Sequence, residues 1–155
     1  MNAELKNSAT WVHGMSENGI SFTTDIRVRY AETDGMKVVY HGNYLTYFEE
    51  ARTNLFRNIG VVYSEIEKTG IFLVVLEAHV KFHRSAIYDD ILHVQATFAE
   101  LPVLKLKIDY QITRNTETDI LVTGQTIHAF VNAQTNKPIR PPHEYLHIMK
   151  KHFLT

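Results

Sequence analysis

Cysteine is absent from this chain of 155 residues. Disulfide bonds, thiolate metal ligands and cysteine nucleophiles are therefore excluded. An excess of positive charge is missing too, because the formal net charge is -1, and so no basic field points to nucleic acid. No apolar run approaches the roughly 20 residues of a membrane-spanning helix, and the N-terminal residues lack the apolar core of a secretory signal. We expect a cytoplasmic protein without a membrane span or a nucleic-acid partner.

Phosphate-binding and serine-hydrolase signatures are also missing. The 7 glycines are scattered, so no Gly-rich phosphate loop is present, and no serine or threonine stands on a G-x-S-x-G elbow. Hydrophobic residues make up 45% of the chain and charged residues 21%, which is ordinary for a globular protein. The length suits one core. We predict a single domain over residues 1–155, with residues 1–19 as an N-terminal extension of no clear period.

One strand and one long helix are predicted in the first half of the chain. Apolar and polar side chains alternate from Phe22 to Tyr30, which indicates a strand with one wet face. Apolar residues then recur at helical spacing from Gly42 or Asn43 to Ile59. Asn43 suits the N-cap of this helix, and Gly60 suits the position just past its end. A short second helix is expected at 64–68.

The second half of the chain reads as strands joined by short connections, which predicts a mostly antiparallel sheet. In the first of these strands we expect Phe72 through Phe82 to form one continuous apolar face, and the first half of that strand to be covered on both sides. Gly124 is a candidate bulge. The expected strands and the closing helix cover residues 71–84, 91–98, 104–113, 120–131 and 144–151, with a hairpin loop at 115–119.

Strands packed on one long helix make an α+β fold, a sheet wrapped around a central helix. A sheet that curls around its helix has few ways to cover its outer side, and pairing with a second copy is one of them. We therefore expect a homodimer.

Asp34 is the first candidate for chemistry. It lies between an apolar strand and an apolar helix, and a helix start collects free N–H groups and partial positive charge. A half-buried carboxylate beside such a start suits attack on a carbonyl. The alternative is that Glu32, Thr33 and Asp34 are only turn and cap residues. His41 is the second candidate, because a backbone N–H at that position can donate to an oxyanion. Its side chain is a second, weaker candidate, as a base, and the alternative is a histidine that is merely packed or solvated in the first turn.

A metal centre is the least favoured reading of the 9 histidines. His143 through His147 match the HExxH pattern, but they open a short terminal helix after two prolines and lack a third ligand. His79 and His83 are expected on one strand face, also without a third ligand. We predict no metal site.

The run from Tyr30 to Tyr44 resembles the signature of the hotdog-fold acyl-CoA thioesterases, in the branch of the 4-hydroxybenzoyl-CoA thioesterases. The segments Phe48–Arg52, Arg84–Leu92 and Lys137–Pro142 extend the likeness, so that it covers about residues 22–145. One residue departs from the pattern, because the family usually has glycine where this chain has Lys37. A bulky cation there would alter the loop, help to hold a CoA phosphate or weaken the enzyme.

The resemblance implies hydrolysis of an acyl-CoA thioester at the interface of a homodimer or homotetramer, with coenzyme A as part of the substrate and no cofactor. Asp34 matches the catalytic carboxylate, as nucleophile or as general base, and His41 matches the residue whose backbone N–H polarises the carbonyl. The resemblance also implies that the first half of the strand beginning at Ile71, with Leu73, Val74 and Val75, flanks the acyl or pantetheine arm. We further expect Tyr40 and Tyr44 to bind substrate, and Lys81 and Arg84, as cations near strand ends, to hold its nucleotide part.

Two other functions fit the same architecture. Hotdog hydratases and dehydratases act on acyl thioesters with histidine and an acidic residue, and enoyl-CoA hydration would identify them. A non-catalytic acyl-CoA-binding dimer is the third reading, which Lys37 keeps open.

Overall fold

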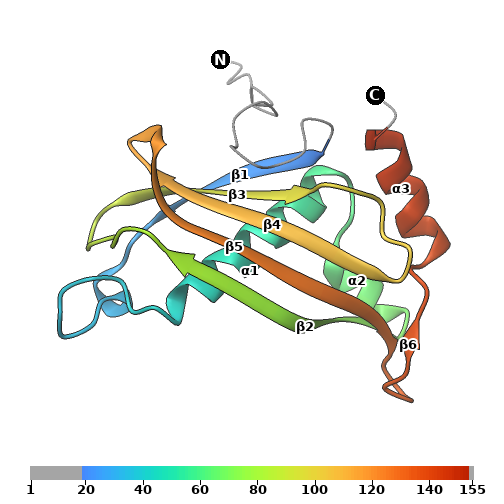
Figure 1. Ribbon diagram of the computed structural model, residues 1–155. Helices are drawn as coiled ribbons and strands as arrows, with labels where there is room; N and C mark the ends of the chain where they lie inside the picture. Colours follow the sequence, from blue (N-terminus) through green and yellow to red (C-terminus); the bar gives the residue numbers. More distant parts are fainter. Residues whose placement is uncertain (1–18, 154–155) are drawn as a thin grey trace.

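The computed structural model describes residues 19–153. The N-terminal extension predicted over residues 1–19 therefore lies almost wholly outside the described range. The described chain forms an antiparallel sheet in the order β1-β3-β4-β5-β2, with β6 paired to β5 (Figure 1). Its strands are β1 Ile20–Arg27, β2 Ile71–Phe82, β3 Ile91–Phe98, β4 Lys105–Arg114, β5 Thr116–Asn132 and β6 Pro138–Ile139.

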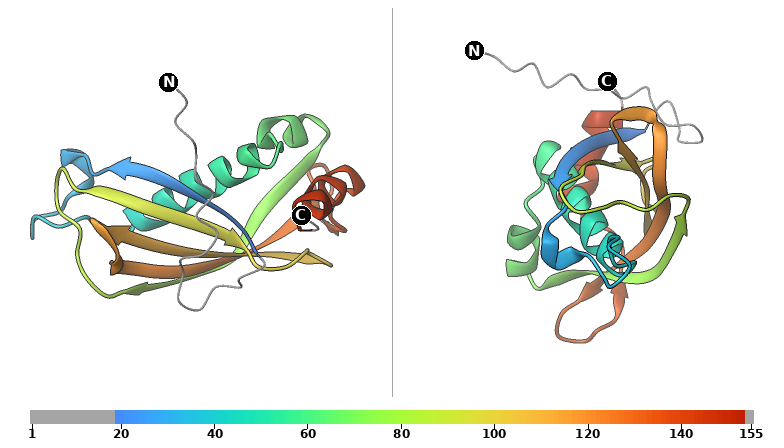
Figure 2. Two further views of the ribbon diagram at one scale, coloured as in Figure 1. Left: turned by 90° about the horizontal axis from the view of Figure 1, so that it is seen from above. Right: turned by 90° about the vertical axis from the view of Figure 1, so that its left-hand side faces the viewer.

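Helix α1, Asn43–Asn58, lies along one face of this sheet, and the sheet curves around it when seen end-on in the right panel of Figure 2. The shorter helices are η1 Tyr30–Glu32, α2 Tyr63–Lys68 and α3 His143–Phe153. The α+β architecture predicted from the periodicity is confirmed. No helix among residues 19–153 is long and apolar enough to cross a membrane.

The predicted apolar stripe of α1 packs on the sheet. Tyr44, Phe48, Ala51, Leu55 and Ile59 are all at most 3% exposed. They recur every three or four residues, which places them on the same side of the helix. Tyr47 and Phe56 are buried as well, which widens the apolar face, whereas Leu45 stays exposed in the single chain.

Gly124 lets α1 approach the sheet. The Phe48 ring stacks on Tyr110, with ring centroids 4.2 Å apart and an interplanar angle of 9°. A Cβ added at Gly124 would come within 2.4 Å of the Phe48 ring and 3.0 Å of the His79 carbonyl oxygen. The bulge predicted at Gly124 is wrong, because the glycine keeps its pairing with Tyr110 and Val80. Its missing side chain makes room for a ring instead.

The bulge lies in β2, at Leu76. Val75 pairs with His128 and Glu77 with Ile127, so Leu76 is the extra residue. A bulge exchanges the two faces of a strand. The predicted continuous face from Phe72 to Phe82 is therefore wrong. Side chains directly opposite in a sheet share a face, and the register puts these six on the α1 side: Ile71, Leu73, Val75, Ala78, Val80 and Phe82.

Strand β2 ends the sheet, and its outer edge has no partner strand among residues 19–153. No residue of β2 is fully buried, and Phe72, Val75, Leu76 and Phe82 are 41–51% exposed. The prediction that its first half is covered on both sides is wrong for one chain. An apolar edge of this kind is a surface that another strand can cover.

Several element boundaries differ from the predictions. The first strand ends at Arg27, because a 3-10 turn begins at Tyr30 and leaves that residue 77% exposed. The hairpin loop expected at 115–119 shrinks to a tight turn around Asn115, whose φ of 61° is the left-handed conformation that Asn tolerates. Strand β6 was not predicted, since two residues carry no periodic signal.

Candidate active site

A cavity of about 230 Å³ opens where the loop after η1, the start of α1 and the end of β2 meet. It brings together Asp34 and His41, which are the two residues predicted to carry the chemistry. The other lining residues are Met36, Val38, Val39, Tyr44, Phe82, His83, Arg84 and Ser85.

Asp34 is half-buried at this cavity. Its Oδ1 accepts a hydrogen bond from the Met36 N–H at 2.8 Å, and its backbone N–H donates to the Val38 carbonyl at 2.9 Å. These bonds make a tight turn that holds the carboxylate in place. Its Oδ2 accepts no hydrogen bond from residues 19–153. One carboxylate oxygen is thus fixed and the other is available to a ligand.

Lys37 closes the same turn by donating its N–H to the Asp34 carbonyl at 2.9 Å. Its φ is 62°, in the left-handed region that glycine adopts without strain and other residues adopt at a cost. Lys37, where the family pattern has glycine, therefore places a long cationic side chain at a position whose backbone conformation favours glycine. The Lys37 side chain is exposed and does not line the cavity.

The start of α1 supplies free donors. Within residues 19–153, neither the His41 N–H nor the Gly42 N–H has a hydrogen-bond acceptor, whereas the Tyr40 N–H donates to the Glu32 carbonyl at 2.9 Å. Unpaired N–H groups at a helix start form a site for negative charge. The His41 side chain is exposed, with its ring centroid 4.4 Å from that of Tyr40.

Gly42, and not Asn43, is the N-cap. The predicted cap is wrong because the Asn43 side chain has another partner: its Nδ2 donates to the Glu32 carbonyl at 2.8 Å. A Cβ at Gly42 would lie 2.7 Å from the Tyr40 ring, so glycine lets that ring fold over the helix start.

Glu32 has a role in this site that its turn sequence does not indicate. It is a turn residue by sequence, yet it is only 9% exposed. Its Oε2 accepts hydrogen bonds from the Arg29 N–H at 2.8 Å and the Tyr47 hydroxyl at 2.9 Å, and its Oε1 accepts two from the Arg29 guanidinium. Burial alone would raise the pKa of Glu32, but these hydrogen bonds and the Arg29 charge outweigh burial and lower it. The Arg29–Glu32 spacing of a capping box was the available signal.

Among the residues predicted to bind substrate, Tyr44 and Arg84 line the cavity. Tyr44 is buried, which raises the pKa of its hydroxyl, and Arg84 pairs with Asp119 at 2.9 Å. Lys81 is exposed on the sheet face away from α1. Five predicted residues lie outside this cavity of the single chain: Tyr40, Leu73, Val74, Val75 and Lys81. Met36, Val38, Val39, Phe82, His83 and Ser85 were not predicted as lining residues.

No group of three or more metal-ligating side chains gathers anywhere in residues 19–153. His143 and His147 lie at the start of α3 with ring centroids 6.4 Å apart. The HExxH match there has no third ligand beside it among residues 19–153.

Comparison with known proteins supports a single assignment. The profile of the thioesterase-like superfamily matches residues 28–149. An acyl-CoA thioesterase, YbgC of Haemophilus influenzae, is 31% identical over 132 residues, which are 84% of this chain and 93% of that protein. A DHNA-CoA thioesterase of Staphylococcus aureus is 32% identical, covers 84% of this chain and 89% of its own, and superposes with a TM-score of 0.79.

A more distant structure shows the same fold. A 4-hydroxybenzoyl-CoA thioesterase, solved with 4-hydroxybenzoyl-CoA, superposes with a TM-score of 0.75 at 19% identity, over 84% of this chain and 99% of its own. At that identity the likeness concerns the fold alone, and it is the hotdog arrangement of a sheet around one helix. With the profile match and the relatives above 30% identity, the chain belongs to the thioesterase-like superfamily.

Proposed function

We propose that this protein hydrolyses acyl-CoA thioesters to the free acid and coenzyme A. One observation carries the proposal: the half-buried carboxylate of Asp34 borders one cavity with His41, whose backbone N–H has no acceptor among residues 19–153. A thioester carbonyl needs a nucleophile on its carbon and donors on its oxygen. The relatives named as thioesterases support the same reaction class.

In the proposed reaction the thioester oxygen accepts hydrogen bonds from the start of α1, where the helix dipole favours the developing negative charge. The free Oδ2 of Asp34 has two roles open to it. It attacks the carbonyl carbon, forms an anhydride and expels the CoA thiolate, after which water cleaves the anhydride. Alternatively it takes a proton from a water molecule, which then attacks the same carbon. Neither route requires a metal or a cofactor.

We further propose that two copies pair through β2. The apolar side chains on the edge of this strand are exposed to solvent, and pairing with a second copy would bury them. Leu73, Val74 and Val75 lie in this strand, outside the Asp34 cavity of the same chain. In a dimer these three residues would flank the acyl or pantetheine arm in the site of the second copy. Whether two dimers join into a tetramer, and the cytoplasmic location, stay predictions from the sequence.

A thiol-release assay over short, long and aromatic acyl-CoAs tests the proposed function. Release of free CoA from at least one of them, at a rate well above spontaneous hydrolysis, is the expected result. An enoyl-CoA is the control, because hydration of its double bond without thiol release would identify a hydratase. Tight CoA binding with no thiol release across the whole panel would contradict catalysis.

A further inference from the structure

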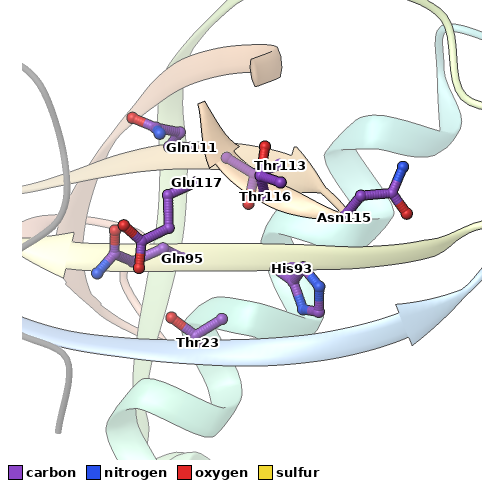
Figure 3. Close-up of a pocket in the computed structure, with 8 residues that line it drawn as sticks. All are labelled: Thr23, His93, Gln95, Gln111, Thr113, Asn115, Thr116 and Glu117. Carbon is purple, nitrogen blue, oxygen red and sulfur yellow. The ribbon is translucent and has the colours of Figure 1, made fainter. Parts of the chain in front are cut away.

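A second cavity, of about 300 Å³, lies on the sheet face that points away from α1 (Figure 3). Side chains alternate along a strand, and Tyr110 and Ile112 of β4 are buried on the α1 side. Gln111 between them therefore faces the other way. The cavity is bordered by β1, β3, β4 and the turn that joins β4 to β5. It shares no lining residue with the Asp34 cavity.

Two glutamines form the floor of this cavity. Gln95 of β3 and Gln111 of β4 are directly opposite in the register, and they are only 9% and 4% exposed. Neither side-chain amide has a hydrogen-bond partner among residues 19–153, although both residues line the cavity. Their amide atoms are not sealed from solvent, because the fully buried unpaired side-chain atoms among residues 19–153 are only His128 Nδ1 and the Tyr145 hydroxyl oxygen. Both amides therefore open into the cavity, where they are available to a ligand.

The neighbouring row of polar residues on the same face differs. Ser21 bonds to Thr97 at 2.6 Å, and Gln125 donates to Asp109 at 2.9 Å. The polar character of this sheet face therefore does not by itself leave amides unpaired. The two glutamine amides at the cavity differ from this row in having no side-chain partner among residues 19–153.

The remaining lining groups limit the kind of ligand. None of the described lining residues is a lysine or arginine, and the only ring among them is the His93 imidazole. Among residues 19–153 the cavity therefore offers no fixed positive charge for phosphate. Its other side chains are mostly neutral, such as Thr23 and Thr113. His93 is bound through Nδ1 to Asp25 at 2.6 Å, which leaves Nε2 as its second polar atom. The Glu117 carboxylate forms no ion pair with residues 19–153.

We propose that this cavity binds a neutral polyhydroxyl compound of about monosaccharide size. Hydroxyl and carboxamide groups each donate and accept, which is the property that matches a ligand rich in hydroxyls. The Glu117 carboxylate, which only accepts, suits two neighbouring hydroxyl donors. The cavity volume equals that of on the order of ten water molecules, enough for a small polyol. This site is independent of thioester hydrolysis.

Ligand-observed saturation-transfer NMR on the full chain tests the proposal, with glucose, sorbitol and myo-inositol as polyol probes. Putrescine and inorganic phosphate are the cationic and anionic probes. We expect saturation transfer to at least one polyol and none to phosphate. The Gln95 and Gln111 side-chain amide signals should shift on titration with that polyol. Binding of putrescine alone would overturn the polyol assignment in favour of an amine site.

Gln95→Met and Gln111→Met keep the side-chain length and remove the amides. Each should weaken polyol binding by about tenfold, the effect of losing one or two hydrogen bonds, while thiol release stays at the wild-type rate. Gln125→Met is the matched control, because Gln125 lies on the same face outside the cavity. Either methionine variant is sufficient if the other does not fold. Polyol binding that is absent, or equal in both variants and the control, would overturn the proposal.

Discussion

The Tyr47 hydroxyl of α1 donates a hydrogen bond of 2.9 Å to the Glu32 carboxylate, which joins the central helix to the loop that carries Asp34. The Glu32 carbonyl strengthens this junction by accepting from the Tyr40 N–H and the Asn43 side chain. Glu32 thus sets where the free N–H groups of the helix start lie relative to Asp34. We infer that Glu32 is a positioning residue for the reaction.

Glu32→Gln tests that role. Gln keeps the shape of the side chain but loses the charge that binds Arg29. The free energy of unfolding should therefore fall by about 1–3 kcal/mol. If Glu32 positions the site, kcat should fall while KM changes little. Tyr47→Phe is the control that removes one hydrogen bond and leaves the carboxylate. If the Glu32→Gln variant is less stable but keeps the wild-type kcat, Glu32 stabilises the fold and does not position the site.

The same variant has a pH signature. The pKa of Glu32 is lowered in the folded state, so its stabilisation is present above its ordinary pKa of 4.5 and is lost as pH falls through the lower folded value. Urea unfolding below pH 4.5 should therefore show a smaller acid-induced loss of stability in Glu32→Gln than in the wild type. Equal losses would contradict the lowered pKa.

His128 is predicted to make the fold sensitive to mild acid. It is fully buried, its Nδ1 has no hydrogen-bond partner among residues 19–153, and burial followed by the Arg52 charge lowers its pKa from 6.5 to about 3. The unfolded chain binds this proton first, so stability falls as pH drops from 6.5 towards 3, by on the order of 1 kcal/mol per pH unit. In His128→Gln the unfolding free energy should depend less on pH in this window. If the unfolding free energies of the wild type and the variant change equally with pH, His128 does not contribute to the acid sensitivity of the fold.

Two substitutions of Lys37 distinguish the effect of its backbone strain from the effect of its charge. Lys37→Gly relieves the left-handed φ and should stabilise the fold by up to about 1 kcal/mol relative to Lys37→Ala, which keeps the strain. Since the side chain does not line the cavity, KM for an acyl-CoA should be the same in both variants and the wild type. An equal rise of KM in both would indicate that the ammonium group binds a CoA phosphate.

Val75→Lys probes the β2 edge. Val75 is 51% exposed in the single chain, so a lysine there should leave the monomer folded but oppose pairing of two copies. Light scattering should give at least twice the chain mass of 17.9 kDa for the wild type and less for the variant, with thiol release lost in parallel. Val103→Lys, at a 77% exposed loop position, is the control. A wild-type monomer with full activity would contradict the shared site.

Periodicity was sufficient to predict α1, its buried stripe and the antiparallel strands, because each depends on local alternation. It failed at Leu76, where one inserted residue exchanges the faces of β2, and a bulge leaves no mark in a run that is apolar on both faces. Asp34 and His41 could be predicted because one motif contains both. The Arg29–Glu32 spacing carried a local signal for Glu32. Phe82 and His83 could not be predicted, since their place in the cavity depends on contacts between segments far apart in the chain.

The most direct test of the central claim is the thiol-release rate of Asp34→Asn with the best acyl-CoA from the panel. Asn keeps the size of the side chain and can still accept the hydrogen bond from the Met36 N–H, so the turn should survive. The account predicts a loss of kcat of at least about 10²–10⁴-fold, with an unchanged circular dichroism spectrum and unchanged CoA binding. Wild-type turnover in this variant would contradict it.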